Sequence, residues 1–348
     1  MTVRVYHAEL AEAQAHPRLA ALMARGRAAG PFDRADWLAL LARECLAPAR
    51  PLLAVAEDDA EDNGAILALP LLASPEGLSA CSNWYSFWAR PLTDAPHRAE
   101  ALLVPLLRSL ADHDALDFAP LPLREAGWMA RALGQAGWIC GLEPAHGNRF
   151  VALNGQDFAG WWKTRPGTLR ATVKRKGAKG LVYCRIATRF DAADWAAYEA
   201  IYAASWKPTE ASPAFLRAFA EAESEAGAYR LGLATMGGMP VAAQFWTIEG
   251  GTAFIHKLAH REDAREASPG TLLSAELFRH VIDVDRVTAV DFGTGDDRYK
   301  ADWMDDVRQR WRVRAYRPGA VRHWPGLVRL LVQRARGRSR LAPWHGAD

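Results

Sequence analysis

The sequence predicts an α/β protein made of two similar halves, in each of which helices flank a mixed sheet. The chain has 348 residues, which suggests two domains at about 100–200 residues per domain. Half of the residues are hydrophobic and 24% are charged, a balance that can build a sizeable core. A repeat between residues 116–140 and 290–313 indicates that the two halves arose from one segment.

The repeat consists of three short motifs in one order. The first half carries Leu116-Asp117-Phe118-Ala119-Pro120, Glu125-Ala126-Gly127-Trp128-Met129 and Trp138-Ile139-Cys140. The second half carries Val290-Asp291-Phe292-Gly293-Thr294, Lys300-Ala301-Asp302-Trp303-Met304 and Trp311-Arg312-Val313. The offsets of 174, 175 and 173 residues are nearly equal, which favours duplication over chance similarity.

In the second half, hydrophobic periodicity and turn residues predict the helices and strands. These signals predict helices at 191–206 and 212–225, followed by strands at 228–235, 240–248 and 252–258. A charged loop at 260–267 precedes Ser268 and Pro269, which are good start signals for a helix that ends near Asp283. The remaining predicted elements are a strand at 287–292, a short helix at 296–306 and a strand at 311–317.

The same signals predict a similar order of elements in the first half. The predicted helices are 34–45, 97–112 and 122–136, and the predicted strands are 51–57, 65–72 and 115–119. The join between the halves lies near 150–160. The predicted organisation is therefore an N-terminal domain over 1–155, a C-terminal domain over 156–318 and a basic amphipathic tail over 319–348.

Composition and short motifs exclude several classes of protein. The longest apolar run, 65–73, is too short for a membrane-spanning helix, which needs roughly 20 residues. The N-terminal MTVRVYHAEL has no apolar signal core, and the four cysteines are far apart, as in reduced cytoplasmic proteins without structural zinc. The net charge of +3 does not indicate DNA binding, and the scattered histidines indicate no metal site.

Further motifs accompany this order of elements. They are Asn83-Trp84-Tyr85-Ser86-Phe87 and Pro91-Leu92 in the first half, and Arg170, Lys174-Arg175-Lys176, Ser205-Trp206-Lys207, Ser268-Pro269-Gly270 and Asp291-Phe292-Gly293 through Tyr299-Lys300 in the second. Over roughly residues 30–317 the chain resembles the FemAB/FemX-like and CelD/BioF2-like acyltransferases, which are tandem proteins of the GNAT fold. The resemblance implies transfer of an acyl group to an amine, with acyl-CoA or aminoacyl-tRNA as the donor.

The helix that starts at Ser268 is the expected donor site. The unpaired backbone N–H groups and the dipole of a helix start attract anions. The resemblance implies that this start, with Ser268, Gly270 and Thr271, holds the pyrophosphate of coenzyme A. The usual G-x-G/A phosphate loop is absent, which keeps aminoacyl-tRNA open as the donor. An ordinary capped helix is the alternative interpretation.

Lys300 is the expected cation at the reacting carbonyl. FemX-like enzymes carry an aromatic–Lys pair after an Asp-Phe-Gly-like strand, as Tyr299-Lys300 does here, and the resemblance implies that Lys300 stabilises the oxyanion. Glu125 stands at the equivalent position of the first half, which places the chemistry in the second half. The alternative is an ordinary surface lysine.

An amine that attacks an acyl group must lose a proton, so a general base is expected. The candidates are His256, Asp291, Asp296 and Asp297. His256 falls inside a predicted strand that would border the acyl cleft. A satisfied sheet histidine and a turn-capping Asp291 are the alternatives.

Two basic regions suggest anionic partners. Residues 163–189 hold nine Lys and Arg and no acid, and Arg170, Lys174 and Arg175 are the candidates for binding phosphates of coenzyme A, of tRNA or of a lipid head group. Residues 324–340 combine an apolar stretch with arginines, which is typical of an interfacial helix on an anionic membrane. A solvated helix face and a helix packed on the body are the respective alternatives.

Aromatic and polar residues near these motifs are expected to bind the acyl group or the acceptor: Tyr85, Trp206, Gln244 and Tyr299. The favoured function is an N-acyltransferase of the cytoplasm or the inner membrane face, with acyl-CoA as co-substrate and no resident cofactor. Its acceptor would be a primary amine such as an amino sugar or a sphingoid-type base. The alternatives are an aminoacyl-tRNA-dependent peptidyl transferase and a non-catalytic peripheral membrane factor in polysaccharide assembly.

Overall fold

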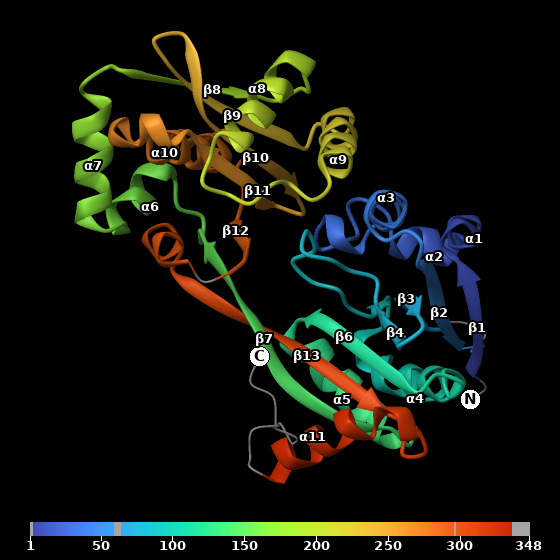
Figure 1. Cartoon of the computed structure of the whole chain (residues 1–348). Helices are drawn as coiled ribbons and strands as arrows, with labels where there is room; N and C mark the ends of the chain where they lie inside the picture. The colour runs from blue at the N-terminus through green and yellow to red at the C-terminus, as the bar shows by residue number, and fades with distance from the viewer. Residues whose placement is uncertain (1–2, 59–63, 296, 336–348) are drawn as a thin grey trace. The chain divides into compact units, whose positions relative to one another are not determined.

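The computed structural model describes residues 3–58, 64–295 and 297–335. The chain divides into two compact units, Met1–Gly147 with Arg308–Asp348 (unit 1) and Asn148–Val307 (unit 2). In each unit a mixed sheet is flanked by helices (Figure 1). The predicted fold class is therefore confirmed.

The sheet of unit 1 follows the strand order β1–β2–β3–β4–β6–β13–β7. Its strands are β1 (Val3–Glu9), β2 (Arg50–Asp58), β3 (Ile66–Ser74), β4 (Gly77–Ala80), β6 (Ala115–Leu121), β13 (Asp306–Tyr316) and β7 (Ile139–Ala152), and the short β5 (Leu92–Thr93) pairs with β3. Strands β1 to β4 pair antiparallel, β4 and β6 are parallel, and β6 and β13 are antiparallel.

Helices cover this sheet from both sides. They are α1 (Leu10–Ala15), α2 (Pro17–Leu22), α3 (Ala35–Cys45), α4 (Ala99–Ser109), α5 (Leu123–Gln135) and α11 (Trp324–Ala335). Leu102 and Leu106 of α4 and Met129 of α5 are fully buried in one core with the apolar side chains of β2 and β3. Figure 1 shows α1 to α3 on the side of the strands that faces away from α4 and α5.

The sheet of unit 2 runs from the end of β7 through β12 (Ala289–Thr294), β11 (Thr252–His260), β10 (Met239–Glu249), β9 (Tyr229–Met236) and β8 (Val182–Ala187). Strands β11 and β12 pair in parallel, and the other neighbours pair antiparallel. The two Gly-Gly turns predicted between β9, β10 and β11 join them, because Gly237, Gly238, Gly250 and Gly251 all have positive φ.

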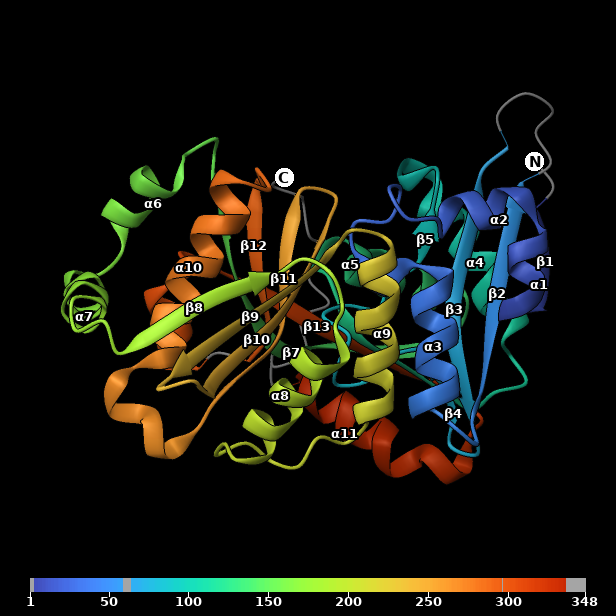
Figure 2. The same ribbon diagram turned by 90° about the horizontal axis from the view of Figure 1, so that it is seen from above.

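The helices of unit 2 are α6 (Phe158–Thr164), α7 (Gly167–Gly177), α8 (Ala192–Ala203), α9 (Pro213–Glu225) and α10 (Pro269–Asp283). Phe245 of β10 packs against α8 and α9 through Trp195 and Phe219, whereas Trp246 packs against Phe278 of α10. Successive residues of a strand point to opposite faces. Helices α8 and α9 therefore cover one face and α10 covers the other (Figure 2).

Each unit completes its sheet with a strand from the other half of the sequence. The first copy of the repeat lies on β6, α5 and β7, and the second on β12, the 3₁₀ helix η4 (Arg298–Asp302) and β13. Strand β6 pairs with β13, and β12 pairs with β7. The compact units have other bounds than the predicted domains 1–155 and 156–318. That division into domains stays a prediction.

Some predicted bounds differ from the observed ones. The helix predicted at 296–306 is the five-residue η4, and β13 begins at Asp306 rather than at residue 311. Strand β11 continues to His260, and most of the expected loop is the 3₁₀ helix η3 (Glu262–Ala267). These stretches are rich in charged residues, so apolar periodicity does not mark their ends. No helix in the described ranges combines the length and the apolar character needed to cross a membrane.

Candidate functional site

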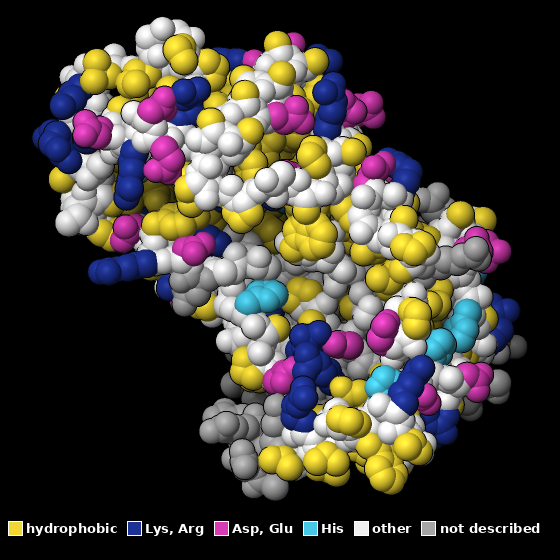
Figure 3. Space-filling model, viewed as in Figure 1, with side chains coloured by type: hydrophobic (Ala, Val, Ile, Leu, Met, Phe, Trp, Pro, Cys, Tyr) yellow, Lys and Arg dark blue, Asp and Glu magenta, His cyan; other side chains and the backbone are white. Residues whose placement is uncertain are grey.

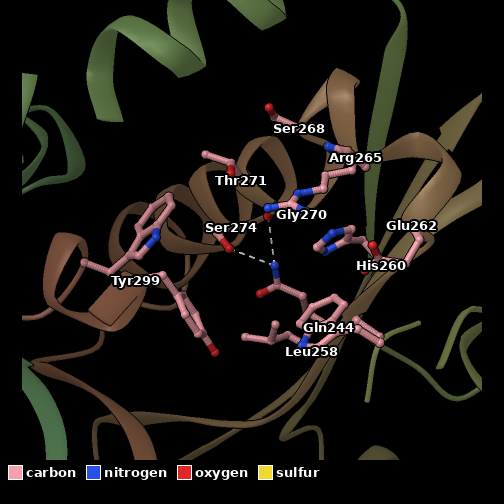
Figure 4. Close-up of a pocket in the computed structure, with 14 residues that line it drawn as sticks. Gln244, Leu258, His260, Glu262, Arg265, Ser268, Gly270, Thr271, Ser274 and Tyr299 are labelled. Carbon is pink, nitrogen blue, oxygen red and sulfur yellow. Dashed lines mark hydrogen bonds between the residues drawn. The ribbon is translucent and has the colours of Figure 1, made fainter. Parts of the chain in front are cut away.

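A cavity of about 620 Å³ opens in unit 2 where β10 and β11 pass the start of α10 (Figure 4). Its volume lies in the range of about 300–1,000 Å³ that is typical of small-molecule sites. The lining residues come from β10, β11, η3, α10, η4 and the segment after α8: Trp206, Gln244, Leu258, Ala259, His260, Glu262, Arg265, Ser268, Pro269, Gly270, Thr271, Ser274, Tyr299 and Trp303.

The start of α10 forms one wall of this cavity. Ser268 has a left-handed backbone (φ 56, ψ 44) that ends η3 and begins α10, and Pro269 occupies the first helical turn. The first intrahelical bond is donated by the Leu272 N–H to the Ser268 carbonyl, at 3.1 Å. The amides of Gly270 and Thr271 precede that bond, so they lie among the N–H groups that a helix cannot pair internally. With the helix dipole, they make this wall suited to an anion.

Gln244 holds the start of α10 against β10. Its side chain is buried, and its amide nitrogen donates to the Gly270 carbonyl at 3.1 Å and to the Ser274 hydroxyl at 2.7 Å. Its carbonyl oxygen accepts from the Trp246 indole at 3.1 Å. Figure 4 shows the two donated bonds crossing from the strand to the helix. Gln244 therefore lines the cavity, as expected of a binding residue, while its polar atoms are engaged within the protein.

Arg265 and Glu262 bring one positive and one negative side chain to the cavity near the helix start. Arg265 of η3 lines the cavity, is exposed, and has no ion-pair partner in the described part of the chain. The Lys176 ammonium of α7 donates to the Glu266 carbonyl next to it. The end of α7 therefore lies beside η3.

The expected phosphate-binding residues of α7 lie outside the cavity wall. Arg170, Lys174 and Arg175 are exposed on α7, and none of them lines the cavity. Arg170 also donates to the Arg165 carbonyl at 3.1 Å. They form a basic surface next to the site rather than part of its wall.

His260 is the histidine inside the site. It ends β11, lines the cavity, and packs against Trp206 with ring centroids 4.5 Å apart. Burial lowers its pKa, helped by the positive charges of Arg265 and Lys207 and opposed by Glu262. The imidazole is therefore neutral at pH 7 and can accept a proton.

His256 lies on the other face of the sheet. Lys257 pairs with Phe245 and Ile255 pairs with Trp246, so the register skips His256 in a β-bulge. Its imidazole shares a 2.7 Å hydrogen bond with the Thr247 hydroxyl and packs against Phe245. Strand β11 does border the cavity, as expected, but through Leu258 and His260 rather than through His256.

Asp291 is buried where β12 meets β7. Its carboxylate accepts from the Asn148 amide at 2.7 Å and from the Gly293 N–H at 2.8 Å. It does not line the cavity, and it fixes the turn after β12. Asp297 is exposed, and Asp296 lies outside the described residues.

Lys300 is buried beneath the same turn. Its ammonium donates to the carbonyl of Thr294 at 2.6 Å and, more weakly, to those of Gly295 and Phe292 at 3.4 and 3.5 Å. Asp297 lies 3.8 Å away. Lys300 itself is not among the residues that line the cavity. It anchors η4, which presents Tyr299 to the cavity next to Trp303.

Three lysines gather behind the cavity rim. The pKa of Lys207 is lowered to about 8, first by burial and then by the charges of Lys257 and Lys300. Lys257 pairs with Glu210 at 2.5 Å. Lys207 has no such partner in the described ranges, and the charges of Asp297 and Glu210 oppose the lowering of its pKa.

Residues of unit 1 do not line this cavity. A recess bounded by Phe32, Asp33 and Phe118 holds only about 10 Å³. Glu125, the counterpart of Lys300, is buried and pairs with Arg124 at 3.0 Å. Tyr85, an expected binding residue, is buried in this unit beside Trp84. The cavity of about 620 Å³ is lined by residues of unit 2.

Of the expected binding residues, the cavity brings together Trp206, Gln244, Ser268, Gly270, Thr271 and Tyr299. His260 and Arg265 are the two that the sequence analysis missed. Both fall in the segment read as a charged loop, and alternation from Leu258 would have placed His260 on the same face. In the described ranges no group of His, Cys, Asp and Glu is arranged to hold a metal ion.

We expect Gln244→Leu to lower the free energy of unfolding by about 1–3 kcal/mol, because it removes the strand-to-helix bonds and leaves the buried Trp246 indole without its acceptor. A urea titration measures the change. Gln309→Leu, at an exposed position, is the control and should change stability by less than about 0.5 kcal/mol. Equal effects of the two variants would contradict the anchoring role of Gln244.

Comparisons with known proteins agree with this geometry. Residues 163–301 match the family model described as an acetyltransferase (GNAT) domain. The structure of FemX has a TM-score of 0.60 at 9% identity, over 92% of this chain and 99% of that one. A tandem GNAT protein from the clavulanic acid biosynthesis pathway has a TM-score of 0.53 at 14% identity, over 90% and 98%. L-PGS from Bacillus licheniformis has a TM-score of 0.52 at 14% identity, over 87% and 96%.

The similarity to the solved structures concerns the fold. A sequence comparison with curated proteins gives no match. The matched segment 163–301 contains the whole wall of the cavity except Trp303. The tandem GNAT fold that the resemblance implied is thus present, with its family match on the unit that holds the cavity.

Proposed function

We propose that this chain, a tandem GNAT-fold protein with an acetyltransferase (GNAT) domain at residues 163–301, is an N-acyltransferase. It moves an acyl group from a thioester donor, acyl-CoA, to a primary amine. The observation that carries the proposal is the cavity itself, in which the start of α10, a cation and a neutral histidine face one space.

The donor enters over the start of α10. The amides of Gly270 and Thr271 and the guanidinium of Arg265 receive the pyrophosphate, since all three offer donors or positive charge at one end of the cavity. The basic surface of α7 lies beside η3 and receives the outer phosphate of the donor. The acyl chain then lies along the apolar wall of Leu258 and Trp303.

His260 takes the proton in the reaction. The amine nitrogen attacks the thioester carbonyl carbon, a C–N bond forms, and the carbonyl oxygen becomes an oxyanion. His260 accepts the proton that the amine loses, the C–S bond breaks, and the proton passes to the leaving thiolate. A histidine with a lowered pKa fits this role because it is unprotonated when the amine arrives. The oxyanion role that the resemblance implies for Lys300 stays a prediction.

The acceptor amine enters beneath Trp206 and Tyr299. These half-exposed aromatic side chains form the rim of the cavity, and aromatic rims suit an amphipathic acceptor with an apolar body. An amino sugar or a long-chain sphingoid-type base has this character. The acceptor would then belong to the cell envelope or to a lipid.

An aminoacyl-tRNA-dependent transferase is the second candidate. The basic surface of α7, with Arg170, Lys174 and Arg175 exposed, and the absence of the G-x-G/A loop favour it. Steep salt dependence of tRNA binding would support this candidate.

A thermal-shift titration tests the donor. Coenzyme A, acetyl-CoA and palmitoyl-CoA are titrated in parallel against the full chain. A donor at 100 times its dissociation constant should add about 2.7 kcal/mol to stability, and the chain length that gives the largest shift identifies the acyl group. Uncharged tRNA is the comparison ligand. A shift with tRNA and none with any CoA species would overturn the acyl-CoA proposal.

Paired histidine variants test the base. Because the pKa of His260 is lowered, the wild-type rate should fall on acidification only below the usual histidine range near 6.5. His260→Gln should lower kcat/KM about 10²–10⁴-fold and remove this acid limb. His256→Gln should keep the limb. Loss of the limb in His256→Gln alone would assign the base to His256 instead. Lys300→Met in the same assay tests the oxyanion role through kcat.

A further inference from the structure

Helix α11 in unit 1 has one packed side and one open apolar side. Leu330 is buried, and Gly326 lies so close to Tyr316 that an added Cβ would come within 2.8 Å of the ring. Trp324 and Val328 are each more than half exposed, and Leu331 and Val332 are more than 40% exposed. The helix is therefore held to the body by one side only.

The exposed residues form a continuous stripe. At about 100° per residue, Trp324, Val328, Leu331 and Val332 fall within an arc of about 100°. Fourteen large apolar residues of the described chain are exposed, and five of them lie in residues 321–332. Such a concentration marks an interaction surface. Figure 3 shows hydrophobic side chains gathered along the edge of unit 1 where α11 runs in Figure 1.

The positive charge around α11 indicates which kind of partner this apolar stripe binds. Residues 319–347 hold six arginines and no Asp or Glu. Arg329 of α11 and Arg317, which precedes the helix, are exposed. Arg322 lies 3.6 Å from the Asp114 carboxylate and 3.1 Å from the His323 imidazole. The arginines after Ala335 lie outside the described residues. An apolar stripe with a basic flank matches an anionic lipid surface, where a tryptophan lies at the level of the head groups. A second copy of the chain would bring arginine against arginine.

We propose that α11 lies on an anionic bilayer, with the stripe of Trp324, Val328, Leu331 and Val332 inserted at the interface. This surface belongs to unit 1 and does not depend on the transferase activity proposed for unit 2. It would hold the enzyme beside lipid or envelope acceptors.

Co-sedimentation of the full chain with lipid vesicles tests this proposal. The vesicles are phosphatidylcholine alone or an equal mixture with phosphatidylglycerol. The wild type should pellet with the anionic vesicles and much less with the neutral ones, and high salt should release it. Binding to neither vesicle, or equal binding to both, would overturn the proposal.

A matched pair of double variants keeps the test specific. Trp324→Ser with Val328→Ser should weaken binding to the anionic vesicles about tenfold or more, because it removes two inserted side chains. Val284→Ser with Met239→Ser changes two comparably exposed apolar residues in unit 2 and should bind like the wild type. Both should melt like the wild type. A first variant that binds lipid normally but lowers the molecular mass in light scattering would assign the stripe to a second copy instead.

Discussion

The pairing of β12 with β7 is the constraint on which the candidate site depends. The Asp291 carboxylate joins Asn148 of β7 to the Gly293 N–H and so fixes where β12 ends. Gly293 has a φ of 67, and the chain turns there toward η4. The Lys300 ammonium then ties η4 to the carbonyl of Thr294. Through this sequence of buried polar contacts, η4 presents Tyr299 to the cavity.

The second anchor of the site is Gln244. It joins β10 to the start of α10, so the strand and the helix that form the cavity wall share buried hydrogen bonds. Buried polar groups are costly when unpaired, and here they are placed where they hold two elements at a fixed distance. The amides of Gly270 and Thr271 are left for a ligand. Strands and a helix start therefore supply the geometry, and His260 at the end of β11 and Arg265 of η3 supply the titratable and charged groups.

The fold could be predicted from the sequence because it rests on periodicity, turn glycines and a repeat. The start of α10 was predicted from Ser268 and Pro269, and the cavity contains both. The β-bulge at His256 could not be predicted, since alternation alone places His256 and His260 on one face. The exchange of β7 and β13 between the two halves of the sequence depends on contacts between residues far apart in the chain. The carbonyls that surround Lys300 belong to the turn after β12, which periodicity does not mark. At the β-bulge and around Lys300, the structure therefore places single side chains differently from the sequence-based prediction.

A crystal structure of the full chain with coenzyme A tests the central claim most directly, because the claim concerns where the donor lies. The account predicts that pyrophosphate oxygens accept hydrogen bonds from the amides of Gly270 and Thr271, with the thiol directed toward His260. Coenzyme A bound only at the surface of α7, with the start of α10 untouched, would contradict it.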